Sequence, residues 1–164
     1  MFYALRMERT MQDLIQDFLA QKHIAIVGVT RDEKGWGRTL YDEFNKRGYD
    51  TYAVNPNARD VAGVTCYASL RDLPTKPDGV LLAVPPHVTD QVVREVAALG
   101  IPRVWMHKGA GAGAVSPAAV QFCKEKNIAA VYGVCPFMYL QPQGFGHKMH
   151  YTFSKWFGGL PKGA

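Results

Sequence analysis

The chain has 164 residues, 48% of them hydrophobic, which is enough for one domain with a sizeable core. Nineteen Lys and Arg residues stand against 14 Asp and Glu, and because the resulting charge of +5 is scattered, a nucleic-acid-binding protein is not expected. No apolar run reaches the roughly 18 to 20 residues of a membrane span, and residues 1–6 lack a signal-peptide core, so we expect a cytoplasmic protein without membrane association.

Helix and strand patterns alternate along most of the chain. Thr10 and Asp13 form a capping box that begins the first helix, and the most hydrophobic run, 79–84, is typical of a central strand covered on both faces. Pro85 and Pro86 end that strand. The predicted order is helix 10–20, strand 23–27, helix 37–47, strand 51–54, a short third strand within 64–70, strand 79–84, helix 88–99, strand 103–106, helix 116–126 and strand 128–132.

This alternation predicts the α/β class, with a Rossmann-like doubly wound parallel sheet in three layers and right-handed crossovers. We expect an amino-terminal helix over residues 1–20, a single domain over 21–140, and a tail over 141–164 that is rich in Gly and aromatic residues. The tail has too many aromatic residues for an ordinary linker. We therefore favour a tail that packs on the domain or on a partner subunit, as a homo-oligomer contact or a contact with another protein. The alternative is a disordered end.

Three predicted strands end in residues suited to a ligand, and in a parallel sheet these ends converge. Gly28 allows a tight turn, and backbone N–H groups at the start of the next helix can face an anion. Thr30 and Lys34 offer a hydroxyl and a cation to a pyrophosphate. The three strand ends are Gly28-Val29-Thr30, Val84-Pro85-Pro86 and His107-Lys108-Gly109.

The spacing of the glycines indicates which nucleotide is expected. Glycines at 28, 35 and 37 do not form the G-x-G-x-x-G loop of NAD-binding domains. The second strand is followed by Asn55-Pro56-Asn57 and Arg59, where an NAD site has Asp or Glu for the ribose diol. This favours a ligand with an extra ribose phosphate, either NADP or coenzyme A. The alternative is that Gly28 only ends a strand and Arg59 is a solvated surface charge.

Five segments, in their order and spacing, resemble the small stand-alone coenzyme A binding proteins. The domain of these proteins is similar to the amino-terminal domain of the succinyl-CoA synthetase alpha subunit, and the resemblance covers about residues 15–140. The segments are I-A-I-V-G-V-T-R at 24–31, Y-A-V-N-P-N at 52–57, V-P-P at 84–86, R-V-W-M at 103–106 and V-Y-G-V-C at 131–135.

The resemblance implies that residues 21–140 bind coenzyme A or an acyl-CoA. Residues 28–31 would wrap the phosphates, 55–57 would edge the adenosine, and 84–86 would lie along the adenine or the pantetheine arm. From the residues alone we expect Trp36, like Trp105 and Met106, to pack in the interior, although it is also the aromatic residue best suited to stack on a base. The candidate cofactor-binding residues are Gly28, Val29, Thr30, Arg31, Lys34, Arg38, Asn55, Pro56, Asn57, Val84, Pro85, Pro86, Lys108 and Gly109.

The same resemblance implies no catalytic residue in this chain. In the synthetase a second domain carries a phosphorylated histidine and another subunit holds the nucleotide, so we expect a non-catalytic binding protein. The alternatives are an NADP-binding protein that resembles an oxidoreductase, and an interaction protein with a vestigial nucleotide site. Replacing Gly28 by valine is expected to abolish ligand binding and leave the chain folded.

The cysteines and histidines predict no metal site. Cys66, Cys123 and Cys135 lack C-x-x-C spacing, which argues against structural zinc and a disulfide framework, and Cys66 and Cys123 resemble core residues. Cys135 is either a small buried hydrophobic residue or a thiol near that of coenzyme A. His147 and His150 are expected to be a solvated pair.

Overall fold

The computed structural model describes residues 8–109 and 113–140. The predicted tail contact and the His147 and His150 pair lie outside these residues. Within them, no helix is both long and apolar enough to cross a membrane.

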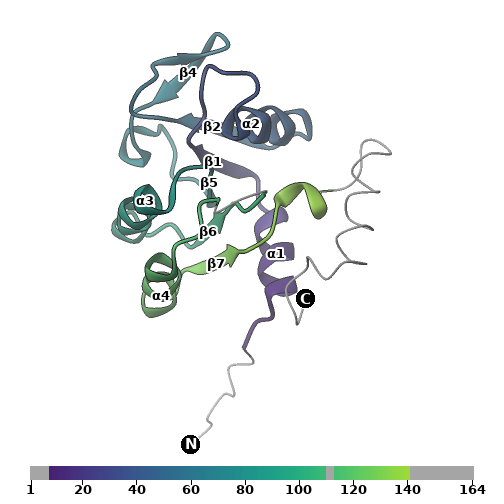
Figure 1. Cartoon of the computed structure of the whole chain (residues 1–164), viewed down its shortest axis with the longest axis vertical. Coiled ribbons are helices and arrows are strands. Elements are labelled where there is room, and N and C mark those ends of the chain that lie inside the picture. Colours follow the sequence, from purple (N-terminus) through teal and green to yellow (C-terminus); the bar gives the residue numbers. More distant parts are fainter. Residues whose placement is uncertain (1–7, 110–112, 141–164) are drawn as a thin grey trace, which may run out of the picture.

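One sheet of seven strands forms the centre of the molecule, in the order β3-β4-β2-β1-β5-β6-β7 (Figure 1). All neighbouring pairs are parallel except β3 and β4, so the predicted doubly wound parallel sheet is confirmed. The strands are β1 (His23–Val27), β2 (Asp50–Val54), β3 (Asp60–Val61), β4 (Val64–Tyr67), β5 (Gly79–Leu82), β6 (Arg103–Met106) and β7 (Ala129–Tyr132).

Helices cover both faces of the sheet, which completes the predicted three layers (Figure 1). α1 (Met11–Leu19) and α2 (Trp36–Lys46) pack on one face, and α3 (Pro86–Ala98) and α4 (Pro117–Glu125) pack on the other. Alternate residues of β1 serve the two cores: Ile24 and Ile26 face α1 and α2, and Ala25 and Val27 face α3 and α4. Single 3-10 turns, η1 (Leu70–Asp72) and η2 (Pro136–Met138), complete the fold.

One predicted strand boundary was wrong, at the carboxyl end of β5, and one strand at the lateral edge of the sheet, β3, was missed. The strand predicted over 79–84 ends at Leu82, because Pro85 is the N-cap of α3 and Pro86 is its first residue, where proline is well tolerated. The single short strand predicted within 64–70 is β4 of a hairpin, in which Ala62 and Gly63 both have positive φ. The preceding partner β3 has only two residues, too few for a periodic signal.

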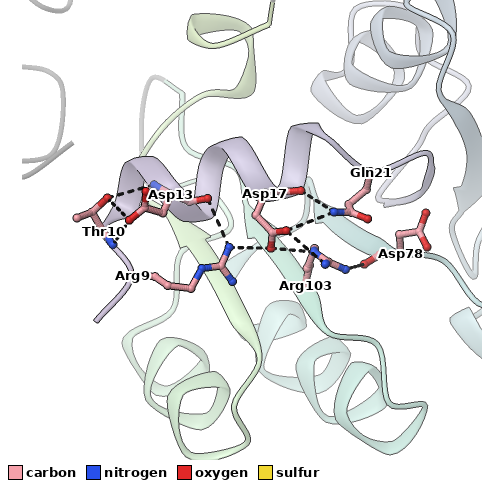
Figure 2. Close-up of polar contacts among 7 residues, drawn as sticks. All are labelled: Arg9, Thr10, Asp13, Asp17, Gln21, Asp78 and Arg103. Atoms are coloured by element: carbon pink, nitrogen blue, oxygen red, sulfur yellow. Dashed lines mark hydrogen bonds and ion pairs between the residues drawn. The ribbon is translucent and has the colours of Figure 1, made fainter. Parts of the chain in front are cut away.

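A polar network fixes α1 to the sheet at the amino ends of the strands (Figure 2). Asp17 of α1 accepts hydrogen bonds from Arg103 of β6, at 2.9 Å from Nε and 3.3 Å from Nη2, and pairs with Arg9 at 2.9 Å. Arg103 Nη1 also donates to the backbone oxygen of Asp78, which directly precedes β5. Burial alone would raise the pKa of Asp17, but the hydrogen bonds from Arg103 and Arg9 hold it below its ordinary value.

Replacing Asp17 by asparagine should lower the free energy of unfolding by about 1.5 to 3 kcal/mol, because it leaves the half-buried Arg103 guanidinium without its carboxylate. Urea unfolding followed by circular dichroism measures this change. The matched control is Asp50→Asn, since Asp50 pairs with Lys22 while both side chains are largely exposed, and its loss should cost only about 0.2 to 1 kcal/mol. Equal costs for the two variants would show that the network does not anchor α1.

Candidate functional site

A cavity of about 410 Å³ opens at the carboxyl ends of β1, β2 and β5. In the sheet order, β1 and β5 are the neighbours from which the chain runs outward in opposite directions, and ligands of doubly wound sheets bind at this switch point. We call it the switch-point cavity. Its lining residues are Val27, Gly28, Thr30, Val54, Asn55, Pro56, Asn57, Ala68, Ser69, Leu70, Ala83, Val84, Pro85, Val88, Gln91, Val92 and Glu95.

Gly28 is the point at which three backbone segments meet. Its φ is +101°, and a Cβ atom there would lie 2.3 Å from the backbone oxygen of Ala83, beyond the end of β5. A Cβ on Gly37, in the first turn of α2, would lie 2.0 Å from the oxygen of Gly28. The start of α2 is thereby held against the end of β1, where its free N–H groups and positive dipole end can face an anion. The expectation that Gly28→Val leaves the chain folded was therefore wrong, because the added side chain meets backbone.

Asn55 fixes the loop after β2 to the loop after β1. Its Nδ2 donates to the backbone oxygen of Val29 at 2.9 Å, and its Oδ1 accepts from the N–H of Asn57 at 2.9 Å. Its side chain therefore holds the cavity's edge rather than reaching for a ligand. Pro56 and Asn57 are exposed at this edge. Among the described residues that line the cavity, none next to the end of β2 is a carboxylate that could hold a ribose diol.

The opposite wall of the cavity is apolar. Val84 and Pro85 leave β5 and lead into α3, from which Val88 and Val92 face the same space. Val88 and Val92 were not among the predicted site residues, because helical periodicity distinguishes an apolar face from a polar one but not a core from a cavity. Six further lining residues outside the strands were also missed: Ala68, Ser69, Leu70, Ala83, Gln91 and Glu95.

The structure divides the predicted site residues into two groups of equal size. Those that line the cavity come from the carboxyl ends of β1, β2 and β5. They are Gly28, Thr30, Asn55, Pro56, Asn57, Val84 and Pro85. Those that do not line it are Val29, Arg31, Lys34, Arg38, Pro86, Lys108 and Gly109.

The residues outside the cavity have identifiable contacts of their own. The Val29 side chain is fully buried in the core, so only its backbone could meet a ligand. Arg31 Nε donates to the backbone oxygen of Asp60 in the β3–β4 hairpin, and Arg38 forms an ion pair with Asp42. Lys34 and Lys108 are exposed, the first in the loop before α2 and the second after β6. Among the described residues, the predicted cations Arg31, Lys34 and Lys108 form no ion pair, and of these three Arg31 alone has a side-chain hydrogen bond.

The three cysteines are buried, as was expected for Cys66 and Cys123. Burial raises the pKa of Cys123 to about 11 and also raises the pKa values of Cys66 and Cys135. These thiols are therefore protonated at neutral pH and weakly nucleophilic. Cys135 is 6% exposed, which favours the interpretation as a small buried hydrophobic residue over a thiol that reacts with a ligand.

Residues 22–141 match the family model described as CoA binding domain. The chain is 32% identical over 98 residues to the ADP-forming acetate–CoA ligase II of Archaeoglobus fulgidus, a match that covers 58% of this chain and 14% of the ligase. It is 26% identical over 92 residues to the alpha subunit of the ADP-forming acetate–CoA ligase II of Pyrococcus furiosus, covering 56% of this chain and 20% of that subunit. The chain thus corresponds to a small part of these relatives.

Solved structures of small proteins match over most of their length. A hypothetical protein from Pyrococcus horikoshii is 27% identical with a TM-score of 0.71, covering 79% of this chain and 88% of that chain. A conserved hypothetical protein from Pyrococcus furiosus is 29% identical with a TM-score of 0.64, covering 70% of this chain and 95% of that chain.

Proposed function

Because the chain belongs to the CoA-binding domain family, we propose that it binds coenzyme A or an acyl-CoA at the switch-point cavity and does not itself form the thioester. The observation that carries this proposal is the position of the cavity, at the carboxyl ends of β1, β2 and β5 within the matched residues. The seven predicted site residues that line it support the same ligand.

The adenosine part of coenzyme A suits the cavity itself. The wall formed by Val84, Pro85, Val88 and Val92 offers an apolar surface to a purine, and Ser69 and Gln91 add polar groups. The phosphates would lie over Gly28, where the first turn of α2 presents N–H groups and Lys34 is free to approach. NAD is disfavoured because the loop after β2 offers amides in place of a carboxylate.

A ligand screen by thermal unfolding tests this proposal. At 100 times its dissociation constant a ligand adds about 2.7 kcal/mol to the free energy of unfolding, and each kcal/mol raises the Tm by about 2 to 4 °C in a chain of this size. At that concentration we expect coenzyme A to raise the Tm by about 5 to 11 °C, and we expect NAD to raise it less. NADP is the third ligand, and a larger shift with NADP or NAD than with coenzyme A would contradict the proposal.

A pocket-filling variant locates the binding site. Ala68 is exposed at the cavity, so Ala68→Phe should fill the space and weaken coenzyme A binding at least about tenfold, as measured by titration calorimetry. The matched control is Ala118→Phe, because Ala118 is equally an exposed alanine but lies on α4 away from the cavity. Equal affinities for the two variants would place the ligand elsewhere.

The non-catalytic part of the proposal is supported by the small share of the ligases that this chain matches. We expect the purified chain to form no thioester from coenzyme A, a carboxylic acid and ATP or GTP. Loss of free thiol, measured over time at several protein concentrations, is the assay. Turnover that rises with protein concentration and falls in Ala68→Phe would show that the chain is an enzyme.

A further inference from the structure

A pair of aromatic rings lies at the same end of the sheet as the switch-point cavity but outside its lining. Trp36, the first residue of α2, has its ring centroid 5.1 Å from that of His107, which follows β6. Trp36 is 49% exposed, so the expectation that it packs in the interior was wrong, and about half of its surface is free to contact a ligand. The ring centroid of Phe137 lies 6.0 Å from that of Trp36. We call Trp36 and His107 the ring pair. They belong to the face covered by α2, whereas the cavity extends toward α3.

In this pair, the Nε2 atom of His107 is a polar atom without a hydrogen-bond partner among the described residues. The residue is 4% exposed, and its buried Nε2 has no hydrogen-bond partner in the described part of the structure. Buried polar atoms in native proteins are nearly always hydrogen-bonded, so an unpartnered one calls for a partner such as a bound water or a ligand group. Burial lowers the pKa of His107 to about 4, so at neutral pH the imidazole is uncharged and can donate one hydrogen bond.

Gly109 keeps the space beside the ring pair open. A Cβ atom there would lie 3.6 Å from His107 Nε2 and 3.6 Å from Trp36 Cζ2, so any side chain would occupy the space between the two rings. Gly109 is not among the glycines with positive φ, so its backbone does not require glycine. The opening beside Nε2 is thus bounded by the two rings and by the Gly109 backbone.

The ring pair is within reach of a ligand that starts in the cavity. The N–H of His107 donates to the backbone oxygen of Leu82, and the next residue, Ala83, lines the cavity and lies against Gly28. An elongated ligand that crosses the sheet edge at Gly28 would pass from the α3 face to the α2 face, as dinucleotides do at switch points.

We propose that the ring pair binds the acyl group of an acyl-CoA, with His107 Nε2 donating to the thioester carbonyl and Trp36 packing on a flat, uncharged acyl group. This inference rests on the proposed function. It selects against a carboxylate-bearing acyl group, because neither ring of the pair carries a charge to balance an anion and the neighbouring Lys108 is exposed to solvent. An aromatic acyl group would gain contact with the exposed face of Trp36.

Titration calorimetry of the full chain with coenzyme A, benzoyl-CoA and succinyl-CoA tests the inference. One hydrogen bond and one ring contact should make benzoyl-CoA bind about tenfold more tightly than coenzyme A, and succinyl-CoA no more tightly. His107→Phe keeps a ring but removes Nε2, and Trp36→Leu removes the exposed ring face. In each variant, the ratio of the dissociation constant of coenzyme A to that of benzoyl-CoA should fall toward one.

Two further variants keep the test decisive. Gly109→Ala should reduce the same ratio by filling the opening, even if the buried His107 variant fails to fold. Tyr132→Leu is the matched control for Trp36→Leu, because Tyr132, the last residue of β7, is also an exposed aromatic residue but belongs to neither the ring pair nor the cavity lining. It should leave the ratio unchanged.

The outcomes separate the two proposals. A wild-type chain that binds none of the three probes overturns the proposed function and this inference with it. A chain that binds coenzyme A but shows no preference for benzoyl-CoA overturns only the inference. A preference for benzoyl-CoA that persists in Trp36→Leu and Gly109→Ala also overturns only the inference.

Discussion

Replacing Gly28 by alanine should lower the free energy of unfolding by about 3 to 5 kcal/mol, the largest single-site effect we expect in this chain. Two costs combine. A side chain at a φ of +101° is strained, and its Cβ atom would lie 2.3 Å from the Ala83 oxygen and 2.9 Å from the Ala83 carbonyl carbon. Both atoms are backbone, so they cannot move aside as a flexible side chain would. The Tm should fall by about 6 to 20 °C.

Gly48→Ala is the matched control for this prediction. Gly48 ends α2 with a φ of +87°, yet a Cβ atom there would meet nothing within 4 Å. This substitution should therefore show only the conformational cost, about 1 to 2 kcal/mol. Urea unfolding of both variants gives the difference, which measures the close approach of β1 and β5. Equal losses of stability would mean that the two strand ends are not in contact.

The order of the elements was readable from the sequence because each long element carries its own period. The crossover helices show apolar residues at helical spacing, and the central strand 79–82 is a continuous apolar run bounded by Asp78 and Pro85. The two-residue strand β3 has too few positions to show a period, and the β3–β4 hairpin was missed as a pair for that reason.

The candidate site was only half predictable, because strand ends are marked in the sequence and side-chain partners are not. Gly28, Asn55 and Pro85 stand at recognisable ends of strands, and the parallel sheet brings them together. The partner of Arg31 depends on where the hairpin lies. Arg38 and Asp42, by contrast, stand at i, i+4 in one helix, a spacing that predicts their ion pair. His107 Nε2 is buried without a partner in a site where Trp36 packs against the imidazole, and the spacing of residues in the sequence does not predict that contact.

Acidification should destabilise the chain through His107. Its pKa is about 4 in the folded state and near 6.5 when unfolded, so between these values the unfolded chain binds a proton that the folded chain does not. The free energy of unfolding therefore falls as the pH falls through this window. From pH 7 to pH 4.5 this one imidazole should remove about 2 kcal/mol of stability.

His107→Phe isolates this contribution from that of the carboxylates. Asp17 and Asp78 also have lowered pKa values, and their stabilising effect is lost at lower pH, but they are present in both chains. Urea unfolding at pH 7, 6, 5 and 4.5 should therefore give a steeper loss of stability for the wild-type chain than for His107→Phe. Parallel curves would mean that His107 is solvated and free to protonate, and the buried, unpartnered Nε2 on which the ring-pair proposal depends would then be lost.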